Sequence, residues 1–68
     1  MRHHKFIVGT RVKVTIPRLI FPDRVYQGLI VNYEDEGQFL RRKEPCYVVI
    51  VDGRKLLRRV RQSWIEPI

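Results

Sequence analysis

Apolar and polar residues alternate near the start of the chain. Val, Val and Ile occupy positions 12, 14 and 16, while Arg11, Lys13 and Thr15 stand between and before them. A period of two is typical of a strand that buries one face and exposes the other. We therefore expect a first strand over residues 8–16, with Arg11 and Lys13 on its solvent face.

The apolar pattern becomes continuous over residues 45–51, and an Asp52-Gly53 pair follows directly. Such a run, rich in β-branched residues, predicts a central strand. It places Tyr47, Val49 and Val51 on one face. The Asp-Gly pair predicts a hairpin with a two-residue turn in which φ is positive.

Four further segments lie between these strands. Pro17 and Pro22 argue against regular structure over residues 17–24, so this segment is expected to be a long loop. Its residues 19–21 are Leu, Ile and Phe, which we expect to fold under the loop as a small satellite core; the alternative is an exposed contact patch. A second strand is expected over residues 25–33, with Gly28 marking a bulge or a close approach of two backbones. An acidic turn over residues 34–37 and a polar loop over residues 38–44 complete this part.

The segment 54–66 permits two interpretations. Leu56, Leu57, Val60 and Trp64 recur at helical spacing among basic residues, which is typical of an amphipathic helix. The preferred interpretation is a fourth strand over residues 55–60, a 3₁₀ turn at residues 62–64 and a short closing strand. The preceding hairpin signal and the short C-terminal ending favour this second interpretation.

The fold class predicted from these patterns is all-β: a single SH3-like, five-stranded barrel. The alternative is an α+β fold with a basic helix at about residues 54–66. Residues 1–7 are expected to form a basic, flexible tail, and residues 8–68 the barrel domain.

The composition adds a strong positive charge to this picture. The 68 residues include 14 Lys and Arg against 7 Asp and Glu, which gives a formal net charge of +7 and a pI near 10.3. In a domain this small, such a balance indicates a polyanionic partner. The single cysteine, Cys46, allows neither an intrachain disulfide nor a cysteine metal cluster, so we expect no metal and no cofactor.

Membrane and export signals are weak. No apolar run approaches the roughly 20 residues that span a bilayer, and the apolar stretch after the basic N-terminus is too short for a signal peptide. We therefore expect no membrane insertion, and a protein of the cytoplasm or the nucleoid.

The order of these elements resembles the SH3-like barrel superfamily, in particular its KOW and Tudor-like branches. The resemblance rests on four motifs: Gly9-Thr10-Arg11-Val12-Lys13-Val14, Gly28-Leu29-Ile30-Val31, the run from Tyr47 to Gly53, and Trp64-Ile65-Glu66-Pro67. The separation of Gly9 from Gly28 is longer than in a KOW motif. The Tyr26-Gln27-Gly28 stretch is also similar to the type II dihydrofolate reductases, but their Val-Gln-Ile-Tyr active-site strand is absent here, so that activity is not implied.

The chain also resembles the small barrel proteins of photosystem I and related electron-transfer adaptors, which bind a protein partner through basic residues on the same barrel. That similarity implies a protein partner as the alternative to nucleic acid.

We predict a non-enzymatic nucleic-acid-binding module that contacts phosphates through arginine-rich surfaces, with DNA and RNA both open. The alternative is a protein-interaction module that docks on an acidic partner or a larger complex. A third hypothesis assigns residues 54–66 to a basic amphipathic helix that binds an anionic membrane or the groove of a partner. A homo-oligomer through an edge strand is also open. The candidate phosphate-binding residues are Arg11, Lys13, Arg41, Arg42, Lys43, Arg54, Lys55, Arg58, Arg59 and Arg61; the candidates for base stacking are Tyr26, Tyr33 and Phe39; those for a partner-binding loop are Arg18, Ile20, Phe21 and Arg24.

Overall fold

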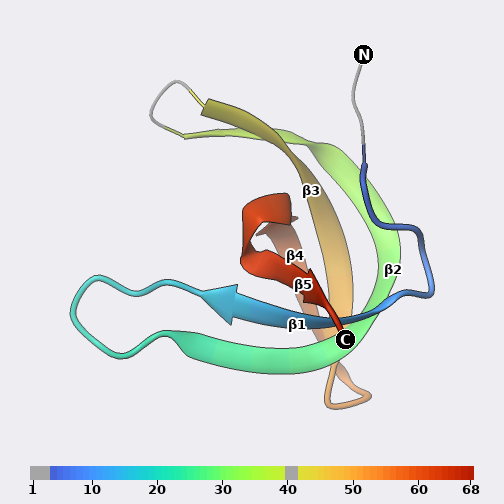
Figure 1. Cartoon of the computed structure of the whole chain (residues 1–68), viewed down its shortest axis with the longest axis horizontal. Helices are drawn as coiled ribbons and strands as arrows, with labels where there is room; N and C mark the ends of the chain where they lie inside the picture. The colour runs from blue at the N-terminus through green and yellow to red at the C-terminus, as the bar shows by residue number, and fades with distance from the viewer. Residues whose placement is uncertain (1–3, 40–41) are drawn as a thin grey trace.

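Five antiparallel strands form one strongly curved sheet in the computed structural model (Figure 1). The structure describes residues 4–39 and 42–68, without the side chains of residues 35–39, 42 and 43. The order across the sheet is β4-β3-β2-β1-β5. The strands are β1 (Arg11–Ile16), β2 (Arg24–Phe39), β3 (Arg42–Val51), β4 (Lys55–Arg61) and β5 (Ile65–Pro67), and a 3₁₀ turn, η1 (Gln62–Trp64), links the last two.

The all-β prediction is confirmed, and a small five-stranded β fold is present. The predicted closure of the sheet into a barrel is wrong, because β4 and β5 are the two edges of the sheet and do not pair with each other. The chain covers the distance between them with η1, so the curved sheet stays open on that side.

The core lies on the concave face of the sheet. Val12 and Val14 of β1 are fully buried, as the alternating pattern predicts, and Tyr47, Val49 and Val51 of β3 join them. Ile30, Val60 and Ile65 complete the buried apolar cluster. The period of two in the sequence therefore identifies the buried face of β1. In the continuous apolar run of β3 it correctly groups Tyr47, Val49 and Val51 on one face, and the structure shows that this face is buried.

Strands β2 and β3 are longer than predicted. The segment 34–44, expected to be an acidic turn and a polar loop, continues their pairing: Glu34 pairs with Cys46, Gly37 with Glu44 and Phe39 with Arg42. The segment has a polar composition without alternating apolar residues, so its sequence gave no strand signal.

The expected satellite core under the β1–β2 loop is wrong. Leu19, Ile20 and Phe21 are 104%, 86% and 59% exposed. The loop leaves the sheet as a projecting hairpin end, seen in cyan in Figure 1, so the body of the domain offers these side chains no surface to pack against.

Gly28 lies where two strand backbones come very close, as predicted. It pairs with Val12 on one side and with Val51 on the other. A Cβ atom at this position would lie 2.0 Å from the carbonyl oxygen of Ile50. Only glycine therefore fits this crossing.

The Asp-Gly pair adopts the predicted positive φ angles, 55° at Asp52 and 70° at Gly53. The Arg54 N–H donates to the Val51 carbonyl at 3.2 Å. The nearest strand pair is Val51 with Lys55, so the connection has three residues rather than the predicted two.

The C-terminal segment is strand, turn and strand, which confirms the preferred interpretation and excludes the helix over residues 54–66. The helical spacing has a different cause. Between the pairs Val49–Leu57 and Tyr47–Val60, β4 contains one residue more than β3. This bulge turns Leu57 and Val60, three residues apart, toward the same face.

Residues 4–6, assigned from sequence to a basic tail, contact the sheet. The His4 Nε2 lies 3.1 Å from the Glu34 carbonyl oxygen and 3.0 Å from that of Cys46. Phe6 packs against the core, and its N–H donates to the Tyr47 hydroxyl at 3.1 Å. These contacts attach residues 4–6 to β2 and β3.

Candidate nucleic-acid interface

The described basic residues predicted to contact phosphate lie on several different elements of the fold. They separate into a pair at the β4 bulge, one cation beside η1, two on the convex side of β1, and one beside Tyr26, with Arg54 exposed in the β3–β4 turn. Arg41 lies outside the described residues, as do the side chains of Arg42, Lys43 and Phe39.

The pair at the β4 bulge consists of Arg58 and Arg59, and both contact the carboxylate of Glu34. Arg59 has a φ of 54°, and its N–H donates to Oε1 of Glu34. Arg58 Nη2 lies 2.9 Å from Oε2 of the same carboxylate. Burial raises the pKa of Glu34, but the Arg59 N–H, the hydrogen bond from Arg58 and the positive charges of both arginines outweigh it and lower the pKa overall. Arg58 therefore has a structural partner.

The cation beside η1 is also paired. Arg61 Nε lies 2.9 Å from Oε1 of Glu44, and its guanidinium stands 6.0 Å from the Trp64 ring centroid. Glu44 also accepts hydrogen bonds from the N–H and the hydroxyl of Ser63. Glu44 thus joins the β3 arm to η1, and Arg61 is a member of that contact.

Two other cations converge on Tyr26. Arg24 and Tyr26 lie on the same face of β2, two residues apart, and pair with Ile16 and Val14 of β1. Lys55, at the start of β4, places its Nζ 3.5 Å from the Tyr26 hydroxyl and 5.2 Å from the ring centroid. Arg24 and Lys55 form no ion pair with a carboxylate among the described residues.

The two cations change the ionisation of the phenol. Burial raises the pKa of Tyr26, whereas hydrogen bonds from Arg24 and Lys55 and the charges of both lower it, and the net direction is down. The positive field at this hydroxyl thus favours negative charge. We call Arg24, Tyr26 and Lys55 the tyrosine cluster.

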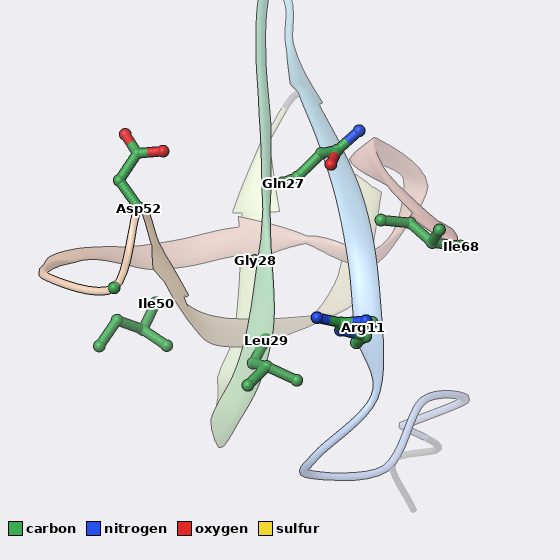
Figure 2. A pocket seen from close by; sticks show the side chains of 8 residues that line it. Arg11, Gln27, Gly28, Leu29, Ile50, Asp52 and Ile68 are labelled. Atoms are coloured by element: carbon green, nitrogen blue, oxygen red, sulfur yellow. The ribbon is translucent and has the colours of Figure 1, made fainter.

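Arg11 and Lys13 project from the convex face of β1. Lys13 stands opposite Gln27 of β2 and Glu66 of β5, and Arg11 opposite Leu29. Arg11 also lines a hollow of about 390 Å³ around Gly28, which Figure 2 shows with Leu29 and Ile50 neighbouring each other. The remaining lining residues are Gln27, Asp52, Gly53 and Ile68. The mixed charge and apolar lining make this hollow a poor match for phosphate.

Tyr33 is engaged by the N-terminal segment. Its ring centroid lies 4.6 Å from that of His4, and its hydroxyl accepts the Val8 N–H at 3.2 Å. Tyr33 as a whole residue is 39% exposed. Stacking of a base on Tyr33 would therefore compete with His4, whereas Tyr26 stands between two cations.

The candidates for a partner-binding loop are all exposed. The Arg18 guanidinium lies 4.8 Å from the Phe21 ring centroid, and the Ile20 side chain is exposed. Arg24 belongs to the tyrosine cluster as well as to the end of this loop. Sequence reasoning placed it with the loop alone, although the period of two along residues 24–26 already sets it on the same face as Tyr26.

Metal-ligand clusters and membrane-spanning helices are absent from the described part of the chain. Within residues 4–39 and 42–68, no group of three or more His, Cys, Asp or Glu side chains is placed to hold a metal ion. No helix in the same residues is long and apolar enough to cross a membrane.

Comparison with known proteins adds no relative: no family model matches the chain, and neither the curated proteins nor the solved structures contain a significant match.

Proposed function

We propose that this protein is a non-enzymatic module that binds nucleic acid through its phosphates, with the tyrosine cluster as the principal contact. The observation that carries the proposal is the convergence of Arg24 and Lys55 on the Tyr26 hydroxyl without a described carboxylate partner. A phosphate oxygen would complete this arrangement, because two cations and a phenol O–H can all donate to it.

The position of the cluster favours a chain-like anion. Arg24 begins β2 and Lys55 begins β4, two strands separated in the sheet by β3, so the curvature of the sheet brings the two cations to one aromatic ring. Exposed Arg54 precedes Lys55 in the chain and extends the positive charge. Successive phosphates of a strand can contact such neighbouring cations, while the Tyr26 ring offers a face for a base.

The charge of the whole chain supports the same partner. With +7 overall, the protein attracts polyanions over distances beyond direct contact, and that attraction weakens with salt. Contacts to phosphate and to the stacking face of a base carry little sequence information, so we expect weak discrimination between sequences.

The test is a fluorescence-anisotropy titration of labelled single-stranded and duplex oligonucleotides at several salt concentrations. Log affinity should fall linearly with log salt, and the Arg24→Gln/Lys55→Gln variant should bind more weakly with a slope shallower by about two. The matched control is Arg11→Gln/Lys13→Gln, which removes the same charge from the convex face. Equal losses in both variants would contradict a role for the cluster, and absence of binding near physiological salt would contradict the function itself.

The aromatic ring has its own test. Tyr26→Leu keeps the apolar bulk beside the core but removes the stacking face and the hydroxyl. The loss of stacking should lower the affinity for single strands by roughly tenfold. This change corresponds to about 1.4 kcal/mol, in the lower part of the range of stacking free energies for one base. Arg58 and Arg59 are unsuitable probes, because substitutions there alter the contacts of Glu34 and the β4 bulge.

A further inference from the structure

The tip of the β1–β2 loop exposes three consecutive large apolar side chains, Leu19, Ile20 and Phe21. The tyrosine cluster does not use them. Scattered apolar residues on a surface are ordinary, but these three follow one another in the loop that projects from the sheet (Figure 1). The apolar tip, defined as residues 19–21, lacks any described contact with the core cluster.

Charge surrounds the apolar tip in a definite order. Arg18 precedes it and lies against Phe21 at 4.8 Å. Arg24 follows it, and behind Arg24 stand Tyr26 and Lys55. The segment 17–24 contains two arginines and one acid, Asp23, so its own net charge is +1. From the tip inward, the hairpin thus presents apolar side chains, then guanidinium groups, then a tyrosine hydroxyl with an ammonium group.

This order matches the layers of a lipid surface. Apolar side chains enter the region of the acyl chains, Arg and Lys reach the phosphates, and Tyr prefers the headgroup level. Each basic residue close to an anionic leaflet contributes attraction, and the +7 charge adds to it.

A fluid partner also fits the lack of packing around the tip. Leu19 is fully exposed, so no neighbouring side chain fixes its rotamer. Entry into a rigid protein pocket would cost conformational entropy for each side chain that becomes ordered. Acyl chains impose no single rotamer, so the unsupported tip loses less on entering a bilayer.

We propose that the β1–β2 loop is an interfacial anchor, whose apolar tip inserts shallowly into an anionic membrane while Arg18 and Arg24 contact lipid phosphates. This differs from the sequence-based expectation of no membrane insertion, which rests on the length needed to span a bilayer rather than to lie at its surface. The anchor shares Arg24 with the tyrosine cluster, but its essential side chains, Leu19, Ile20 and Phe21, are apolar and take no part in the proposed nucleic-acid function.

The experiment measures co-sedimentation with vesicles of mixed phosphatidylcholine and phosphatidylglycerol, and with vesicles of phosphatidylcholine alone. We expect binding to the mixed vesicles that weakens with salt, and much weaker binding to the neutral ones. The Leu19→Ser/Ile20→Ser/Phe21→Ser variant should lose about 100-fold or more in affinity for the mixed vesicles. Arg18→Gln should lose about fivefold, because it removes one headgroup contact.

Two matched single substitutions test whether vesicle binding depends on the apolar tip or on any exposed apolar side chain. Ile20 and Ile68 are 86% and 71% exposed, so Ile20→Ser and Ile68→Ser remove similar exposed side chains. Only Ile20→Ser should weaken vesicle binding. In a Phe21→Trp variant, the added fluorescence should shift to the blue on mixed vesicles, which reports entry of that side chain into an apolar environment.

Oligonucleotide binding by the triple variant is measured alongside vesicle binding, so that the anchor and the proposed nucleic-acid function are tested separately. Retained oligonucleotide binding would also show that the variant is folded. Retained oligonucleotide binding with lost vesicle binding supports the anchor. Absence of vesicle binding by the unmodified protein, or binding that the triple variant retains, overturns it and leaves a protein surface as the partner of the tip. A folded triple variant, judged by its circular dichroism, that loses oligonucleotides and vesicles together also overturns it, because the tip would then be a nucleic-acid contact.

Discussion

The carboxylate of Glu34 accepts the backbone N–H of Arg59, the one bulge residue of β4 that has a positive φ. The same carboxylate pairs with Arg58 at 2.9 Å. Glu34 belongs to β2, so this contact reaches across β3 to the edge strand. The contact gives the Arg58 guanidinium a carboxylate partner, whereas Arg59 uses only its backbone N–H.

The first prediction concerns the stability that Glu34 provides. Glu34→Gln keeps an oxygen for the Arg59 N–H but removes the charge, and we expect a loss of about 1 kcal/mol in the free energy of unfolding at neutral pH. Because folding lowers the pKa of Glu34 below its ordinary 4.5, this contribution is present above that pH and disappears as the pH falls through the folded-state value. Urea unfolding of both proteins at neutral and acidic pH measures the difference.

The control for Glu34 is Glu66→Gln, since Glu66 is exposed on β5 and has no ion pair with a described residue. This substitution should change stability by less than about 0.5 kcal/mol. A difference between wild type and Glu34→Gln that stays constant down to strongly acidic pH would contradict the electrostatic explanation.

The second prediction concerns the backbone of Arg59. A φ of 54° costs an L-residue roughly 1 kcal/mol and costs glycine almost nothing. Arg59→Gly should therefore be at least as stable as the wild type, while Arg59→Val should be less stable by about 1 kcal/mol or more, because β-branched residues resist this conformation. Thermal unfolding followed by circular dichroism compares the three proteins. Equal stability of the Gly and Val variants would be inconsistent with the bulge geometry.

The third prediction concerns the crossing at Gly28. An added Cβ would lie 2.0 Å from the Ile50 carbonyl oxygen and 2.9 Å from Val51 Cγ1, so β2 and β3 must separate to admit it. We expect Gly28→Ala to destabilise the protein by about 3 kcal/mol.

Gly53→Ala is the comparison for Gly28, because its Cβ would meet nothing within 4 Å and only its φ of 70° opposes the change. Its cost should be about 1 kcal/mol. Urea unfolding ranks the two variants, and the reverse order would refute the close approach.

The fourth prediction concerns the Tyr47 hydroxyl, which accepts the Phe6 N–H and donates to Oε1 of Gln62. Tyr47→Phe leaves the Phe6 N–H without its acceptor, while Gln62 Oε1 keeps the Lys5 N–H, and we expect a loss of about 1–2 kcal/mol. Tyr33→Phe removes a hydroxyl from a more exposed site, where water can replace it, so its effect should be smaller. Similar losses in the two variants would argue against the buried contact.

The Tyr47 hydroxyl also predicts a dependence on alkaline pH. Burial raises the pKa of Tyr47 above its ordinary 10.0, although hydrogen bonds from the Phe6 and Lys5 backbones oppose the shift. The unfolded chain therefore ionises first, and the protein loses stability as the pH rises above about 10. Unfolding measured at increasing pH should show a shallower loss in Tyr47→Phe than in the wild type.

Local sequence alone determined the strands that bury one face. The alternation from Arg11 to Ile16 identified both faces of β1, and the run ending at Asp52-Gly53 identified β3 and its turn with positive φ. Each of these features depends on neighbours along the chain: side chains in a strand alternate between faces, and Asp-Gly tolerates the left-handed region. The charge of +7 is likewise a property of the sequence, and it defined the class of partner that we propose.

Only the tertiary structure decided which charges have partners and which apolar residues are covered. Glu34 and Arg59 are 25 residues apart and meet because β2, β3 and β4 lie in one sheet. Lys55 reaches Tyr26 because that sheet is strongly curved. Leu19, Ile20 and Phe21 stay exposed because their loop projects beyond the core. No local pattern specifies these distances, since they depend on the register and curvature that all five strands establish together.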